Sequence, residues 1–105
     1  MIYDFRTYTL HPGKTQEYLE IYEREALPVQ REHLGQLVGY FTSEIGPLNE
    51  IVHLWRYASL ADRETRRAAL EADPAWDVYR AHYKELDAID HQNSKILKPT
   101  PFSPA

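Results

Sequence analysis

The segment from residue 51 to residue 57, IVHLWRY, constrains the fold more than any other part of the chain. It is rich in β-branched and aromatic residues, which favours a strand. Alternation along a strand separates Ile51, His53, Trp55 and Tyr57 from Val52, Leu54 and Arg56. Neither set is convincingly polar, whereas a strand with one face in water carries polar residues at every second position. The sheet that contains this strand must therefore be covered on both faces.

Three other segments have the composition and alternation of strands. They are residues 2–10 (IYDFRTYTL), 36–45 (QLVGYFTSEI) and 92–97. The turn Gly46-Pro47-Leu48-Asn49 predicts a hairpin between the second strand and the third. In the second strand, Leu37, Phe41 and Ile45 alternate with Val38, Tyr40 and Thr42, so this strand also lacks a polar face.

Helical spacing of apolar residues predicts two helical regions between these strands. The first follows Pro12 and runs to about Val29, with a kink or break that Pro28 causes near Ala26-Leu27. The second starts at the N-cap candidate Ser59 and runs to about Glu71. It restarts at Asp73-Pro74, from which Trp76, Tyr79, Tyr83 and Leu86 form an apolar stripe.

The element order β-α-β-β-α-β predicts an α+β, ferredoxin-like domain with both helical regions on one face of a four-stranded antiparallel sheet. Its other face would be bare and apolar, and a second copy of the chain is the simplest cover. We therefore expect a homodimer joined through sheet faces, a dimeric α/β barrel. The 105 residues predict one domain, with residues 98–105 as an extended, proline-rich tail.

Composition narrows the range of partners. The net charge is −4 and no run of Lys or Arg exceeds two residues, which argues against nucleic acid and anionic membranes as partners. The chain has no cysteine, so disulfides and thiol catalysis are excluded. No stretch approaches the roughly 20 apolar residues of a membrane span, and no leader peptide is visible. We expect a cytoplasmic protein.

Several motifs resemble the NIPSNAP family in order and spacing. The first motif is Tyr3-Asp4-Phe5-Arg6-Thr7-Tyr8-Thr9-Leu10, followed by Pro12-Gly13-Lys14. The second is His53-Leu54-Trp55-Arg56-Tyr57-Ala58-Ser59-Leu60, followed by Arg63, Arg67, Leu70 and Asp73-Pro74-Ala75-Trp76. The third is Asn93-Ser94-Lys95-Ile96-Leu97-Lys98-Pro99. The resemblance covers nearly the whole chain and implies the dimeric α/β-barrel fold. The family often has Glu where Asp4 stands, so this shorter carboxylate need not reach the same partner. Relatives with this barrel include cofactor-independent monooxygenases, haem-degrading enzymes, dehydratases and binding proteins, so the fold alone does not assign an activity.

The residues that could carry chemistry lie on the first and third strands. His53, Trp55 and Tyr57 share one strand face, and Arg6 and Tyr8 are expected beside them. We take His53 as the candidate general acid or base and Arg6 as the clamp for an oxyanion or carboxylate. The candidate substrate-binding residues are aromatic: Tyr8, Trp55, Tyr57, Tyr18, Tyr22 and Tyr83. Each also has a structural interpretation as part of the core, or for Arg6 as an ion pair with Asp4 or Glu44.

Three functions remain open on these residues. The first is a small-molecule pocket, catalytic without a cofactor; the second is a non-catalytic ligand-binding or protein-interaction module. The third is a haem- or metal-dependent monooxygenase with His53 or His82 as an axial ligand, although no metal-binding motif is present and we expect no cofactor and no metal site. A cavity above about 300 Å³ at His53, Arg6 and a tyrosine would favour the first. Arg63, Arg66 and Arg67 are interpreted as a solvated helix face.

Overall fold

Four strands form one antiparallel sheet in the computed structural model, which describes residues 1–105. The strands are β1 (Ile2–Leu10), β2 (Gln36–Thr42), β3 (Glu50–Tyr57) and β4 (Ile89–Leu97). Their order across the sheet is β2-β3-β1-β4, so the first and third strands of the chain are central. This arrangement confirms the ferredoxin-like fold.

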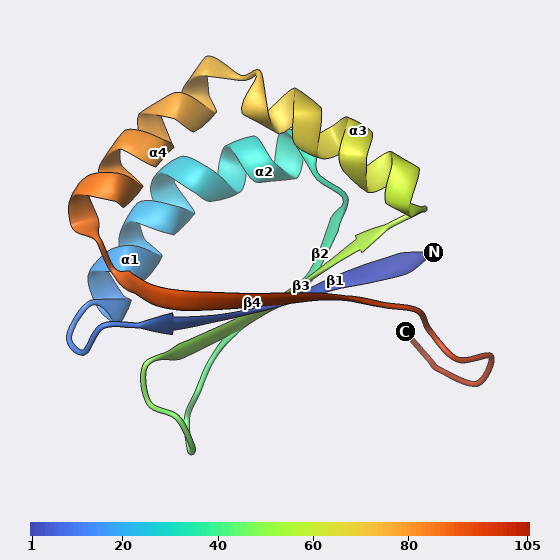
Figure 1. Cartoon of the computed structure of the whole chain (residues 1–105), viewed down its shortest axis with the longest axis horizontal. Coiled ribbons are helices and arrows are strands. Elements are labelled where there is room, and N and C mark those ends of the chain that lie inside the picture. Colours follow the sequence, from blue (N-terminus) through green and yellow to red (C-terminus); the bar gives the residue numbers. More distant parts are fainter.

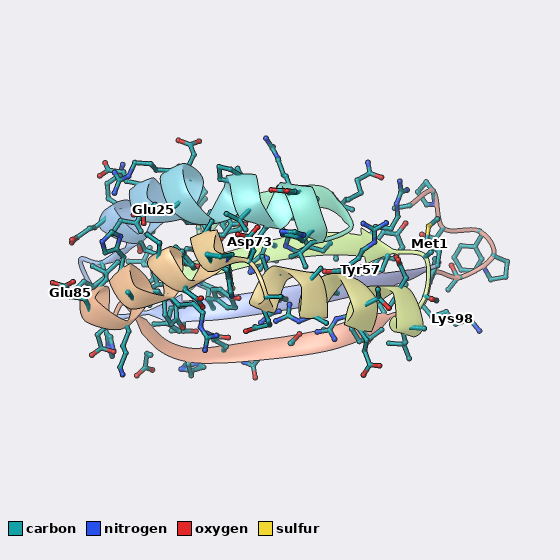
Figure 2. The ribbon with its side chains drawn as sticks, turned by 90° about the horizontal axis from the view of Figure 1, so that it is seen from above. Met1, Glu25, Tyr57, Asp73, Glu85 and Lys98 are labelled. Carbon is teal, nitrogen blue, oxygen red and sulfur yellow. The ribbon has the colours of Figure 1, made fainter.

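The helices all cover the same face of the sheet (Figure 1). The first row consists of α1 (Thr15–Ile21), the π-helical segment η1 (Tyr22–Ala26) and α2 (Leu27–His33), and the second of α3 (Leu60–Glu71) and α4 (Pro74–Leu86). Seen from above, the two rows lie side by side over the sheet, and Asp73 marks the junction of α3 and α4 (Figure 2). None of these helices has the length and hydropathy that a membrane span requires.

Local sequence signals explain where the helices begin and where the first row is irregular. Ser59 Oγ accepts a hydrogen bond from the Asp62 N–H at 3.1 Å, and the Asp73 carboxylate accepts one from the Ala75 N–H at 2.9 Å. Both N-caps match the predicted positions. The irregularity predicted at Ala26-Leu27 is the end of the π-helical segment, which widens the helix ahead of Pro28.

The register of β1 and β3 places the candidate residues under the helices. Arg6 lies opposite His53, and Asp4 opposite Trp55. Along β3, every second residue from Ile51 to Tyr57 is buried, and the residues between them are only partly buried. The helices therefore cover the face of β3 that carries His53, Trp55 and Tyr57, a choice between two faces that alternation alone left open.

The face assignment predicted for β2 was wrong at one point. The register shifts between Leu37 and Gly39, so that Val38 is an extra residue and Leu37 lies opposite Trp55 while Tyr40 lies opposite His53. A bulge of this kind reverses the alternation. Leu37 and Tyr40 consequently share the helix-covered face, whereas strict alternation had placed them on opposite faces.

Two strand ends also differ from expectation. β2 ends at Thr42 rather than Ile45, and β4 begins at Ile89 rather than Gln92. β4 starts early because Asp87 adopts a left-handed conformation with φ 47°, which ends α4 abruptly. Polar and apolar residues alternate only weakly along β4, because it is an edge strand with mostly exposed side chains. The exposed tail after Leu97 contains a turn at residues 101–102 and is therefore not uniformly extended.

The opposite face of the sheet has no helix over it. Phe41 is 58% exposed there, and Leu97 is also exposed. The turn between β2 and β3 projects below the sheet, away from the helices (Figure 1), and carries exposed Ile45 and Leu48. This surface is the bare apolar face that the sequence predicted.

Candidate functional site

A cavity of about 210 Å³ lies between the sheet and the two rows of helices. Its wall contains all the residues that the sequence analysis selected for catalysis or substrate binding: Arg6, Tyr8, Tyr18, Tyr22, His53, Trp55, Tyr57 and Tyr83. The cavity is smaller than the roughly 300 Å³ set as the mark of an enzyme pocket. The structure thus brings the candidate residues together in a compact space, and their roles stay predictions.

His53 forms the centre of the sheet side of this cavity. Its side chain is buried, with the ring of Tyr8 edge-on at 4.8 Å and the ring of Tyr40 stacked at 4.7 Å between centroids. Trp55 Nε1 donates a hydrogen bond to His53 Nδ1 at 3.0 Å. Because an indole N–H only donates, Nδ1 must be the unprotonated nitrogen and the ring proton resides on Nε2. No protein group accepts from this Nε2–H.

The surroundings of His53 determine its protonation state. Burial lowers the pKa of His53 to about 3, the Arg6 charge acts in the same direction, and Asp4 opposes both. The hydrogen bond from Trp55 also favours the neutral ring, since it occupies the lone pair that a second proton would need. At neutral pH this histidine is therefore uncharged and its Nε2–H is a hydrogen-bond donor, while its role as a general acid or base stays a prediction.

A buried carboxylate, Asp4, organises the cations beside His53. Its side chain is 1% exposed; it accepts a hydrogen bond from Arg63 Nε at 3.0 Å and one from Ser94 Oγ at 2.8 Å. Arg6 approaches the same carboxylate only to 3.8 Å, and its Nε is buried without an acceptor in the protein. The predicted Arg6–Asp4 pair exists, but Arg63 is the closer partner, which leaves Arg6 free to bind another group.

Much of the rest of the wall is formed by uncharged aromatic side chains. Burial raises the pKa of Tyr8, Tyr18 and Tyr22, so these phenols stay protonated at neutral pH. The Tyr18 and Tyr40 hydroxyls lie 3.4 Å apart, and Tyr22 donates to Gln30. The Tyr57 hydroxyl, at the end of β3 beside α3 (labelled in Figure 2), is buried without a partner. The wall therefore offers ring surface and a small number of polar groups.

The sequence analysis missed the contribution of α3. Arg63 binds Asp4 and Arg67 lines the cavity, so the interpretation of these arginines as solvent-facing was wrong. Arg66 does face outward and pairs with Asp62 at 2.9 Å. One signal could have found the inward pair. Arg63 and Arg67 share a helical stripe with the buried Leu70, at spacings of four and three residues.

The other histidines lie outside this cavity. His82 Nδ1 donates a hydrogen bond to the Glu25 carboxylate at 2.7 Å, and His33 Nε2 donates one to the Asp73 carboxylate at 2.7 Å. Glu32 places a third potential metal ligand near His33 and Asp73, but it is exposed and Asp73 already serves as an N-cap. His53 does not suit a haem axial ligand, because its Nε2 carries the ring proton and Nδ1 is occupied.

These observations define a class: a ferredoxin-like α+β protein with a small, aromatic-walled cavity between its sheet and its helices. The family model described as NIPSNAP matches residues 3–104. The chain belongs to the NIPSNAP family, as its motifs indicated.

Relatives of known structure and sequence agree with this assignment. A NIPSNAP-family protein of unknown function from Agrobacterium tumefaciens has 50% identity and a TM-score of 0.91, over 99% of this chain and 92% of that one. An uncharacterised NIPSNAP domain protein from Burkholderia xenovorans has 33% identity and a TM-score of 0.91, over the whole of both chains. The human protein NipSnap homolog 3A is 36% identical over 97% of this chain but only 40% of its own length. The chain thus spans about two fifths of that curated relative.

The fold also extends beyond the family. An antibiotic biosynthesis monooxygenase has a TM-score of 0.65 with 13% identity, over 96% of this chain and all of that one. Such a likeness shows a shared ferredoxin-like fold and nothing about chemistry.

Proposed function

We propose that this NIPSNAP protein binds a small organic molecule in the cavity over Arg6 and His53. The observation that carries the proposal is the state of one polar atom in each of three residues that line this cavity. Arg6 Nε, His53 Nε2 and the Tyr57 hydroxyl are buried, and none has a partner in the protein. A buried donor without an acceptor costs about 1–3 kcal/mol. Three such groups around one cavity are typical of a site whose partners come from a ligand.

The experiment uses the fluorescence of the protein itself. The chain has two tryptophans, and both Trp55 and Trp76 line the cavity, so an aromatic ligand should change their emission. We would titrate phenol, benzamide and benzoate. Gln92→Phe places a ring at the mouth of the cavity, because Gln92 lies on the exposed edge strand and lines it. Gln16→Phe is the matched control, since Gln16 is exposed on α1 and does not line this cavity.

The proposal predicts that at least one probe changes the tryptophan emission in a saturable way. Gln92→Phe should then weaken its binding by about tenfold or more, as expected when a cavity is blocked, while Gln16→Phe should leave it unchanged. Absence of saturable binding by all three probes, or equal effects of the two variants, would overturn the proposal.

Catalysis without a cofactor is the second candidate function. Arg6 and His53 line one cavity and each carries an N–H without an acceptor in the protein; two such donors could stabilise an oxyanion that develops on a substrate. In such a mechanism His53 donates a hydrogen bond that polarises a substrate oxygen, and it does not transfer a proton. Incubating a small-molecule extract with the wild type and with Arg6→Gln, followed by mass spectrometry, tests it. If the wild type consumes a compound that Arg6→Gln does not, catalysis is supported. If the two incubations give identical mass-spectrometric profiles, the protein is a non-catalytic binding module.

We also propose that two copies pair through their bare sheet faces. Phe41 and Leu97 are exposed on this face, and the β2–β3 turn, which carries exposed Ile45 and Leu48, projects on the same side (Figure 1). A two-fold pairing would cover identical patches with one another. Light scattering should give twice the chain mass of 12.3 kDa at micromolar concentration; a monomeric mass would contradict pairing.

The cytoplasmic location stays a prediction, which fractionation of cells checks.

A further inference from the structure

The two donors at the sheet side of the cavity come from directly paired residues. Arg6 and His53 lie opposite each other on β1 and β3, and their side chains point to the same face of the sheet. His53 must present Nε2–H, because Trp55 donates to its other nitrogen. Arg6 Nε carries a hydrogen as well, and neither atom has an acceptor in the protein. Both groups can only donate, so the matching ligand atom is an acceptor oxygen.

The charges around these donors favour an anion. Asp4 is compensated by Arg63 at 3.0 Å, and Glu71 by Arg80 at 2.9 Å. Arg67 lines the cavity and forms no ion pair, while Arg6 lies at 3.8 Å from an Asp4 that Arg63 already binds. Two guanidinium groups therefore retain charge toward a cavity whose phenols and histidine are neutral. A carboxylate would provide both the acceptors and the negative charge.

The dimensions and the walls favour a flat ligand with one ring. A dry protein cavity of about 150 Å³ holds benzene, so the 210 Å³ present here can hold a single ring with a substituent. The walls are rings as well: Tyr22 and Tyr79 meet edge-on at 6.4 Å between centroids, and Trp76 lies 5.0 Å from Tyr79. Such rings contact another aromatic or conjugated group favourably by edge or face.

We propose that the ligand of this cavity is a single-ring or conjugated organic carboxylate, whose oxygens accept hydrogen bonds from Arg6 and His53 while Arg67 supplies a second positive charge. This inference rests on the proposed binding function and names the class of ligand. His53 acts in it as a donor of fixed protonation state.

Matched acids and amides test this inference, because each pair differs little in shape but differs in charge. We would measure the binding of benzoate, phenylacetate and cinnamate, and of benzamide, phenylacetamide and cinnamamide, by tryptophan fluorescence at pH 7.5. Arg6→Gln removes the guanidinium group and its charge from the cavity wall. Arg24→Gln removes an equal charge from the exposed surface of η1, where Arg24 is 68% exposed, and is the control.

The inference predicts that at least one acid binds about tenfold or more tightly than its amide, as a charge-assisted hydrogen bond requires. Arg6→Gln should abolish this preference and Arg24→Gln should preserve it. Amides that bind as tightly as their acids would overturn the inference and leave the binding cavity itself intact. No response to any of the six compounds would overturn both. The comparison of acid with amide on the wild type decides the question even if Arg6→Gln does not fold.

Discussion

At the scale of single residues, His53 has the environment that departs most from that of an exposed side chain. Its pKa of about 3 compares with an ordinary value of 6.5. Between these values the unfolded chain binds a proton at this residue and the folded chain does not. Acid therefore favours unfolding, and the free energy of unfolding should rise with pH from 3 to 6.5 by up to about 1.4 kcal/mol per unit, then level off.

The variant His53→Asn tests this dependence. Asparagine offers an oxygen that can accept from Trp55 but has no proton to gain in this range, so the variant should lose stability less steeply between pH 6.5 and pH 4.5. Urea unfolding at pH 4.5, 5.5 and 7.5 measures the difference. Equal slopes in the wild type and the variant would show that His53 titrates normally.

Whether the location of a side chain could be predicted depended on whether a strand or a helix carries the residue. His53, Trp55, Arg6 and Tyr8 could be grouped because strand alternation fixes which side chains share a face. Arg63 could not be grouped with them in the same way. A charged residue on a helix usually faces water, and only the buried Asp4 across the domain explains why it turns inward.

At the scale of elements, helix starts were predicted closely, whereas irregularities were predicted only where a residue type causes them. Pro28 marked the π-helical irregularity because its ring and missing N–H disturb a helix. The bulge at Val38 had no such marker. It depends on the pairing of β2 with β3, which a single strand does not reveal.

The N-cap of α3 gives a test at this scale. Ser59→Ala removes the oxygen that accepts the Asp62 N–H, so we expect a loss of about 1 kcal/mol in the free energy of unfolding. Ser103→Ala, in the exposed tail, is the control and should change it by less than about 0.5 kcal/mol. Chemical denaturation of both variants measures these values; equal stabilities would show that the cap contributes nothing.

At the scale of the whole molecule, one layer of helices covers one face of the sheet and leaves the other exposed (Figure 1). Phe41→Asp should therefore dissociate a dimer without unfolding the chain, because Phe41 is 58% exposed in the single subunit. Val78→Asp is a matched control, since Val78 is 57% exposed but lies on α4. Light scattering gives the mass and circular dichroism the folded content. A dimer that survives Phe41→Asp would place the interface elsewhere.

The claim that the cavity between sheet and helices is a ligand site is tested most directly by nitrogen-15 NMR of its two donors. Addition of cinnamate should shift the signals of Arg6 Nε–H and His53 Nε2–H, while the Nε–H signal of exposed Arg24 stays in place. Unchanged donor signals at high concentrations of cinnamate, benzoate and phenol would contradict the account, because the account places the ligand against these two groups.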